Sequence, residues 1–278
     1  MSSTDQLSWA PPRWTPLLRS EEPAHGLYLR LCDTNGLARS AIMRTLTGVR
    51  CERVWNGRDL HALAEISKCP ITDLERSAFR GGSGRAIRVR EHVLDARDDL
   101  LKSPRRSCPD CLNESHHHRF WWDLAFIATC PRHLRRLASH CSCGRPLSWK
   151  DGLLARCFAC DHGDVAAVAV EEADSDVVEL DRWFLAQLGV GDHSASPPAL
   201  HGLQLRQAIQ VIERTAVLDL LGYDDPNAGL YDLHMDAAKA RAHGFRLICE
   251  GRLEALLDRV HAGNVGDWIK RIRDSMVR

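Results

Sequence analysis

Seven of the eleven cysteines lie between residues 108 and 160, and six of them fall in three closely spaced pairs that suit metal binding. Cys108 and Cys111 form a CxxC pair. After eighteen intervening residues, Cys130 and His133 form a CxxH pair. Zinc takes four thiolate or imidazole ligands at tetrahedral corners, and a two-residue gap lets both side chains of a tight turn reach one ion. These four residues therefore predict a closed zinc site.

A second set of ligands follows directly along the chain. Cys141 and Cys143 form a CxC pair, and after thirteen intervening residues Cys157 and Cys160 form a CxxC pair. This spacing is typical of an all-thiolate zinc ribbon. The total number of cysteines is odd, and pairing at ligand spacing favours metal over disulfides or buried free thiols. The sequence thus predicts two structural Zn²⁺ ions.

The remaining histidines leave the ligand assignment partly open. His140 and His162 are alternatives to His133 or Cys160, whereas the residues from His116 to His118 are typical of a polar loop. A catalytic zinc keeps a coordination position for water, but both predicted sets supply four protein ligands. The chain also contains neither HExxH nor the zinc-deaminase pattern. We expect the metal to stabilise the fold and the protein not to be an enzyme.

The residues before the cysteines predict a helical domain over residues 13–100. Leu27, Tyr28 and Leu31 share a helix face that ends at Asn35-Gly36, and a second helix over residues 37–47 ends at Gly48.

Two further short helices are predicted on either side of Lys68–Pro70, the second with a capping box of Thr72 and Glu75. A helix-turn-helix that directs Arg76 and Arg80 toward DNA and a helical hairpin in a small bundle both fit this pattern. Residues 81–85 are expected to form a turn.

Hydrophobic spacing also predicts which residues pack. Cys32, Cys51 and Cys69 lack partners at ligand spacing and are expected in the core. Trp121 and Trp122 are expected to pack the cysteine turns together.

Charge is balanced over the whole chain but not along it. There are 37 basic and 37 acidic residues, yet residues 102–150 hold nine basic and three acidic ones, and residues 157–181 hold eight acids and no base. The basic region is suited to phosphates and the acidic strip to a basic protein partner. Besides Arg76 and Arg80, the predicted nucleic-acid contacts are Arg105, Arg106, Arg132, Arg135 and Arg136.

The predicted fold is mainly α. Its parts are the helical helix-turn-helix domain (13–100), tandem zinc-finger modules (101–165), an acidic strip and linker (166–200), and a C-terminal helical domain (201–278) that includes a segment around Trp268. The chain has no apolar run of membrane-spanning length and no secretory-signal pattern at its start, so a cytoplasmic protein without membrane contact is expected.

The order CPxCL, aromatic stretch, CPxH, CxCG and distant CxxC resembles the TniQ family of transposition target-selection proteins. GLYLRLCDTNGL also resembles the family's opening helix, although His25-Gly26 stands where the family often has Ser-Trp. The likeness covers about residues 13–160. It implies an adaptor that links an AAA+ ATPase of the TnsC or TniB type to target DNA or, in some relatives, to a CRISPR effector with its guide RNA.

Two other classes of function fit the residues. The first is a zinc-containing helix-turn-helix transcription regulator that binds its operator as a homodimer. The second is an enzyme that uses one zinc, which the absence of an open site disfavours.

Overall fold

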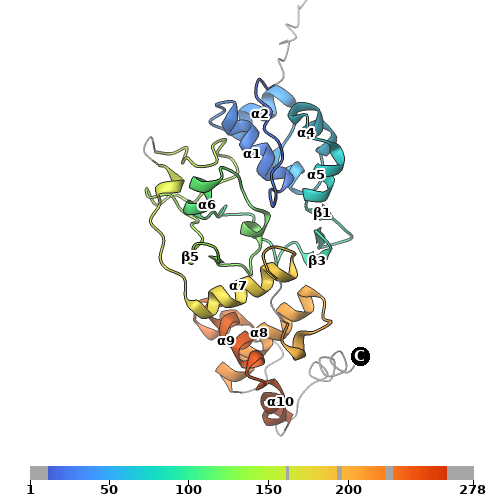
Figure 1. The fold of residues 1–278 in the computed structure, drawn as a ribbon, viewed down its shortest axis with the longest axis vertical. Helices are drawn as coiled ribbons and strands as arrows, with labels where there is room; N and C mark the ends of the chain where they lie inside the picture. The colour runs from blue at the N-terminus through green and yellow to red at the C-terminus, as the bar shows by residue number, and fades with distance from the viewer. Residues whose placement is uncertain (1–11, 161–162, 193–195, 223–227, 262–278) are drawn as a thin grey trace, which may run out of the picture. The chain divides into compact units, whose positions relative to one another are not determined.

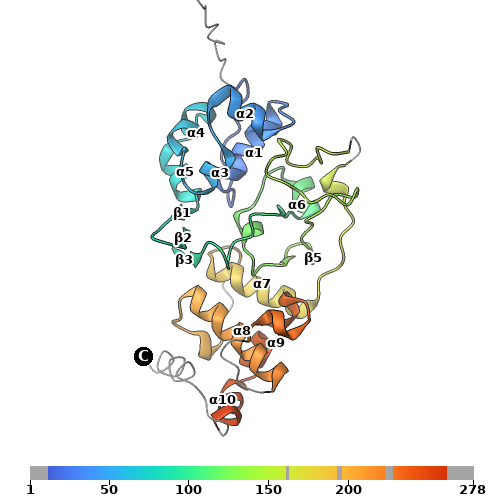
Figure 2. The ribbon, with the colours of Figure 1, turned by 180° about the vertical axis from the view of Figure 1, so that it is seen from behind.

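A computed structural model describes residues 12–160, 163–192, 196–222 and 228–261, and its contacts divide the chain into two compact units. The first unit comprises residues 1–90, 95–124 and 137–170, and the second comprises residues 91–94, 125–136 and 171–278. Helices dominate both units (Figure 1 and Figure 2), as expected, and short strands that were not predicted accompany them.

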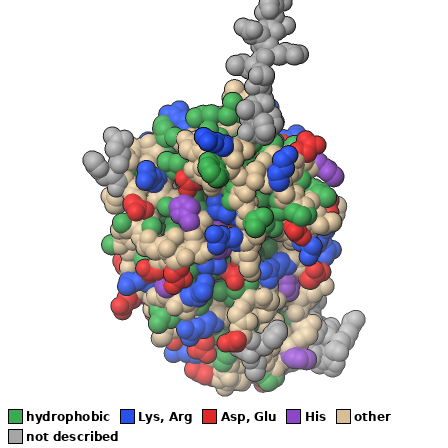
Figure 3. Space-filling model, turned by 45° about the horizontal axis from the view of Figure 1, so that its top comes forward, with side chains coloured by type: hydrophobic (Ala, Val, Ile, Leu, Met, Phe, Trp, Pro, Cys, Tyr) green, Lys and Arg blue, Asp and Glu red, His purple; other side chains and the backbone are tan. Residues whose placement is uncertain are grey.

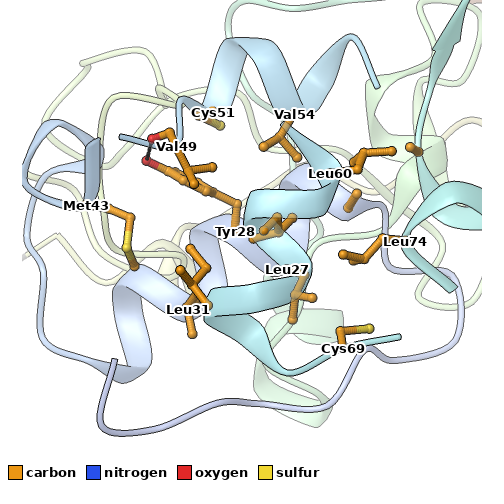
Figure 4. Packing of buried hydrophobic residues seen from close by; sticks show 14 of the residues in the cluster. Leu27, Tyr28, Leu31, Met43, Val49, Cys51, Val54, Leu60, Cys69 and Leu74 are labelled. Carbon is orange, nitrogen blue, oxygen red and sulfur yellow. Dashed lines mark hydrogen bonds between the residues drawn. The ribbon is translucent and has the colours of Figure 1, made fainter. Parts of the chain in front are cut away.

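The first unit begins with five helices that surround a core of apolar side chains. They are α1 (Ala24–Thr34), α2 (Ser40–Thr47), α3 (Cys51–Trp55), α4 (Leu60–Ser67) and α5 (Ile71–Ser77). Figure 4 shows Leu27, Tyr28 and Leu31 of α1 among side chains from the other four helices. Burial of the predicted face of α1 is thereby confirmed. The predicted core positions of Cys32, Cys51 and Cys69 are confirmed as well.

The predicted helix ends are also confirmed. Helix α1 stops before Gly36, whose φ is 69°, and α2 stops at Gly48, whose φ is 74°. Glycine adopts these left-handed angles without a steric cost. The start of α2 differs from the prediction, because the helix begins at Ser40 and not at residue 37.

Helices α4 and α5 are the two short helices predicted on either side of Lys68–Pro70. The predicted capping box is wrong, because α5 begins at Ile71 with Pro70 as its N-cap and with no side-chain cap bond. Thr72 therefore lies inside the first turn and not before it. The pair has the order of a helix-turn-helix, and its use on DNA stays a prediction.

Three strands follow that the sequence reading missed: β1 (Arg80–Gly81), β2 (Ala86–Val89) and β3 (His92–Asp95). Strands β1 and β2 are antiparallel with Arg80 opposite Arg88. Most of β3 belongs to the second unit. The predicted turn over residues 81–85 connects β1 to β2. The first unit also contains α6 (Pro109–Glu114), η1 (Phe120–Asp123) and η2 (Val165–Ala167).

The second unit is built mainly from helices. Its elements are β4 (Thr129–Cys130), β5 (Arg135–Arg136), α7 (Ser175–Gln187), η3 (Pro198–Leu200), α8 (Leu205–Leu221), η4 (Leu230–Leu233), α9 (Ala237–Cys249) and α10 (Leu253–His261). Helix α9 packs against both α7 and α8. The predicted stop of the long helix at Gly222 is confirmed, and the segment around Trp268 lies outside the described residues. Among the described helices, none combines the length and apolar character that crossing a membrane requires.

Close packing of α9 on α8 depends on one glycine. A Cβ atom at Gly244 would overlap the Ile212 carbonyl oxygen and touch Ala216. Gly244→Ala is therefore expected to lower the free energy of unfolding of this unit by about 1–3 kcal/mol or more, which is the usual cost of overpacking a core. Urea denaturation would measure the change. Gly229→Ala is the control, because a Cβ there meets nothing within 4 Å, and equal losses in the two variants would contradict the prediction.

Candidate metal centres and a buried polar cluster

The two predicted ligand sets each come together in the structure. In each set, one ligand atom per residue lies within 4.8 Å of the others. The first set is Cys108, Cys111, Cys130 and His133, and the second is Cys141, Cys143, Cys157 and Cys160. The spacing along the chain therefore identified both groups correctly, and each group could hold a metal ion.

Local structure fixes the first CxxC pair. Cys108 is the N-cap of α6 and Cys111 lies in its first turn, with Pro109 at the first helical position. Proline suits that position because its φ is already helical and its missing N–H would have no partner there. Both cysteines are fully buried. A short helix thus presents two thiols on one side.

The CxxH pair is fixed by a polar contact within the second unit. Cys130 ends β4, and its Sγ lies 3.4 Å from Nδ1 of His133. The buried carboxylate of Asp181 on α7 accepts bonds from the Ala128 N–H and from the N–H and hydroxyl of Thr129. This contact holds the strand that carries Cys130 and was not visible in the sequence.

Distances in the second set match tetrahedral zinc. The Sγ atoms of Cys141 and Cys160 are 3.6 Å apart, and those of Cys143 and Cys157 are 3.8 Å apart. A Zn–S bond of about 2.3 Å places two sulfurs of a tetrahedron about 3.8 Å apart. The residues present therefore fit a Cys₄ zinc ion.

Gly163 completes the second set without contributing a ligand. Its N–H donates to the Cys160 carbonyl, and its own carbonyl accepts from the Cys157 N–H. A Cβ atom here would lie 2.6 Å from the Cys160 sulfur and 2.7 Å from the Cys141 sulfur. Only glycine leaves room for four converging thiols.

Hydrogen bonds among these thiols change how readily each of them ionises. Burial raises the pKa of Cys141, but hydrogen bonds from the Cys143 backbone and neighbouring side chains outweigh it and lower the pKa to about 7. The thiol of Cys160 is hydrogen-bonded to Cys141 first and to Cys143 second, and these bonds raise the pKa of Cys160 to about 12. Four close thiols can all ionise only if a cation compensates their charge, which is what a bound zinc ion does.

A third group, which the sequence reading did not identify, lies in the interior of the first unit. It consists of His25, His118 and Asp123, all with fully buried side chains. The Asp123 carboxylate lies 2.9 Å from Nε2 of His25 and 3.0 Å from Nε2 of His118. These are hydrogen-bond lengths, and two neutral imidazoles that donate to one carboxylate account for them. We name this group the His-Asp cluster.

Aromatic rings surround the His-Asp cluster and exclude water. The Trp149 ring centroid lies 4.9 Å from that of His25 and 4.8 Å from that of His118, and Trp55 lies 4.1 Å from His25. Burial lowers the pKa of both histidines well below the usual value. Burial raises the pKa of Asp123 well above its usual value. The positive charges of Arg106 and Arg105 lower this pKa, but their effect is smaller than that of burial.

The prediction of a polar loop over residues 116–118 is therefore wrong for two of its three histidines. His117 and His118 are buried, and only His116 is exposed, with its Nε2 2.5 Å from the Asp33 carboxylate. Trp121 and Trp122 are buried, as predicted for packing residues. His140 bonds to Ser139 and belongs to neither metal group, and His162 lies outside the described residues.

Arg105 does not lie on a basic surface, so the expectation of an exposed side chain is wrong. It is fully buried and donates to the Leu154 carbonyl. Arg106 is half-buried and donates to the carbonyls of Trp122 and Leu124. Both guanidinium groups are engaged in holding the chain around the cysteines.

The other predicted nucleic-acid contacts are distributed over both units. In the first unit, Arg76 is exposed and paired with Asp73, and Arg80 is exposed on β1. In the second unit, Arg132 is exposed, whereas Arg135 is half-buried and Arg136 pairs with Asp236 at 2.7 Å. On the face drawn in Figure 3, basic side chains alternate with acidic and hydrophobic ones and form no continuous basic surface.

Much of the acidic strip serves the fold. Asp164 caps η2 and Asp174 caps α7, while Asp181 is the buried acceptor for Thr129. Asp164 and Asp174 stay exposed at the helix ends that they cap, whereas Asp181 is buried and out of reach of a basic partner.

Comparison with protein-family models gives a match in the N-terminal half of the chain. The family model named TniQ matches residues 13–137. This segment belongs to the TniQ family. A search of curated proteins found no match to the chain.

The TniQ region contains the first cysteine group and the whole His-Asp cluster. The second cysteine group begins at Cys141, so it lies beyond the match, which ends earlier than the resemblance over residues 13–160 suggested. Because TniQ proteins are associated with transposition, the chain is a transposition-associated protein.

Proposed function

We propose that the protein is a non-enzymatic adaptor in DNA transposition. It selects the target site by linking an AAA+ ATPase of the TnsC or TniB type to target DNA or to a target-recognition complex. The observation that carries this proposal is the TniQ match over residues 13–137. The family match supports an association with transposition. The adaptor role is the more specific function that we propose.

The geometry of the cysteine groups supports a role without catalysis. Each group supplies four protein ligands of the kinds that zinc prefers, and a closed tetrahedral site leaves no position at which water or substrate could be activated. Zinc bound there would fix the path of the chain around residues 108–160. The metal would then support a surface that binds partners.

A reconstitution experiment tests the adaptor role. The full chain is mixed at low salt with an AAA+ ATPase of the TnsC or TniB type from the same organism, with ATP and duplex DNA, and bound protein is measured by pull-down. We expect retention that depends on the cognate ATPase, with an unrelated AAA+ ATPase as the control. If the chain does not bind the ATPase and instead binds one short duplex with half-site symmetry, it is a transcription regulator and the proposal fails.

A further inference from the structure

A groove of about 780 Å³ lies on the first unit. Its walls come mainly from residues 39–56, which include α2 and α3, and from residues 145–159, which connect the two halves of the second cysteine group. All of these residues belong to the first unit. None of its basic residues was among the predicted nucleic-acid contacts.

The groove is strongly basic. Two acidic residues, Glu52 and Asp151, line it against six cations. The cations are Arg39, Arg44, Arg50, Lys102, Arg145 and Lys150. All six are exposed, and within the described residues none of them forms a salt bridge. A concave surface with this excess of positive charge attracts a polyanion.

Aromatic side chains accompany the cations. Phe158 is 41% exposed, and the Arg39 guanidinium lies 3.9 Å from the centroid of its ring. Trp55 and Trp149 also line the groove, with ring centroids 5.2 Å apart. Both contact His25, so the wall that they form is held by the buried His-Asp cluster. The groove thus has a rigid aromatic side and an exposed stacking surface.

We propose that this groove binds single-stranded nucleic acid, with phosphates on the cations and unpaired bases on Phe158 and Arg39. Proteins bind single strands through a basic groove and aromatic stacking surfaces. In a duplex the faces of the bases are covered by their neighbours, so Phe158 would have no ring to stack on. An acidic peptide could use the cations but would gain nothing from the exposed aromatic ring.

The inference deepens the proposed function by naming a partner for the first unit, and it rests on that function for the presence of nucleic acid at the target. A single strand could come from opened target DNA or from an RNA of the recognition complex. Both share the chemistry described above, so DNA and RNA probes are both required.

Fluorescence anisotropy with the zinc-loaded full chain tests whether the cations of the groove bind the phosphates of a single strand. The probes are labelled fifteen-residue oligo-dT and oligo-U and a duplex of equal length. Arg44→Ala combined with Arg50→Ala is expected to weaken single-strand binding about tenfold or more near 0.1 M salt. It should also lower the slope of log affinity against log salt by about 1.4, since each phosphate contact contributes about 0.7. Arg58→Ala combined with Arg97→Ala removes the same charge outside the groove and is expected to change affinity less than twofold.

The stacking surface has its own test. Phe158→Ala is expected to weaken single-strand binding about five- to a hundredfold, the range of base–aromatic stacking, while the salt slope stays unchanged. Zinc content and the midpoint of thermal unfolding are measured for every variant, so that loss of fold is not mistaken for loss of contact.

Three results would overturn the inference. The first is no binding of either single strand by the wild-type chain, which leaves the ATPase pull-down, and hence the adaptor role, unaffected. The second is duplex binding at least as tight as single-strand binding with no effect of Phe158→Ala. The third is tighter binding of a fifteen-residue polyglutamate than of the oligonucleotides with the same dependence on Arg44 and Arg50, which would assign the groove to an acidic protein partner.

Discussion

Replacing Cys157 by serine is expected to remove one of two bound zinc ions and to unfold the chain around the second cysteine group. The sulfur of Cys157 lies 3.8 Å from that of Cys143, and a serine hydroxyl is a poor replacement for a thiolate on zinc. Structural zinc contributes on the order of 10 kcal/mol to the folding of small modules, so this is the largest effect that we expect. Elemental analysis of the purified chain would measure the metal content, and urea denaturation would measure the loss of stability.

Gly163→Ala tests the same site without removing a ligand. The added methyl group would lie within 2.7 Å of the sulfurs of Cys160 and Cys141, so the variant is expected to bind the second ion more weakly and to release it first to a chelator. Cys249→Ser is the matched control, because this cysteine is exposed and belongs to neither group. Retention of both ions by Cys157→Ser would contradict the two-site assignment.

Removal of the Asp123 carboxylate is expected to cause the second-largest loss. In Asp123→Ala, the buried Nε2–H groups of His25 and His118 lose their acceptor and Arg105 loses a nearby negative charge. Each buried donor that is left without an acceptor costs about 1–3 kcal/mol, so the two together are expected to cost several kcal/mol. The free energy of unfolding from urea titration would measure it. Asp123→Asn keeps one carbonyl acceptor and is expected to lose less.

The control for Asp123 is an exposed aspartate. Asp98 pairs with Arg85 across 3.8 Å with both side chains more than half exposed, so Asp98→Ala is expected to cost at most about 1 kcal/mol. Similar losses in Asp98→Ala and Asp123→Ala would contradict a stabilising role for the His-Asp cluster. The zinc content of Asp123→Ala should equal that of the wild type, and loss of one ion would show that the cluster is a metal site instead.

Local patterns predicted the features that depend on neighbours in the sequence. Metal ligands at two-residue spacing must face one ion, so Cys157 and Cys160 could be assigned without knowledge of the fold. Helix ends at Gly48 and Gly222 were predictable for a similar reason, because a left-handed residue ends a helix wherever it occurs.

Features that depend on distant partners could not be predicted. His118 and His25 meet the same carboxylate although they are 93 positions apart in the sequence. Arg105 appeared to be a surface charge, but it contacts the backbone of Leu154, 49 residues away. The basic groove is another example, since its two walls are about a hundred residues apart along the chain. Such contacts are set by the packing of the whole unit, and composition carries no signal of them.

The two walls of the groove are joined by main-chain bonds. The Ser40 N–H donates to the Lys150 carbonyl, and the Gly152 N–H donates to the Ala38 carbonyl. At Gly152 the chains approach so closely that a Cβ atom would overlap the Leu37 carbonyl oxygen. The Ser40 hydroxyl also donates to the Lys150 carbonyl. The two main-chain bonds themselves need no particular side chain except at Gly152, where only glycine fits.

This join limits how such proteins can exchange parts. A hybrid that takes its N-terminal helices from one relative and its cysteine-rich segment from another keeps these bonds only if the second parent carries a glycine at position 152 and the first parent leaves the same close approach at residues 37–40. Recombination with a breakpoint between residues 40 and 150 is thus expected to succeed mainly between parents that share this crossing, and the two segments are expected to be inherited together.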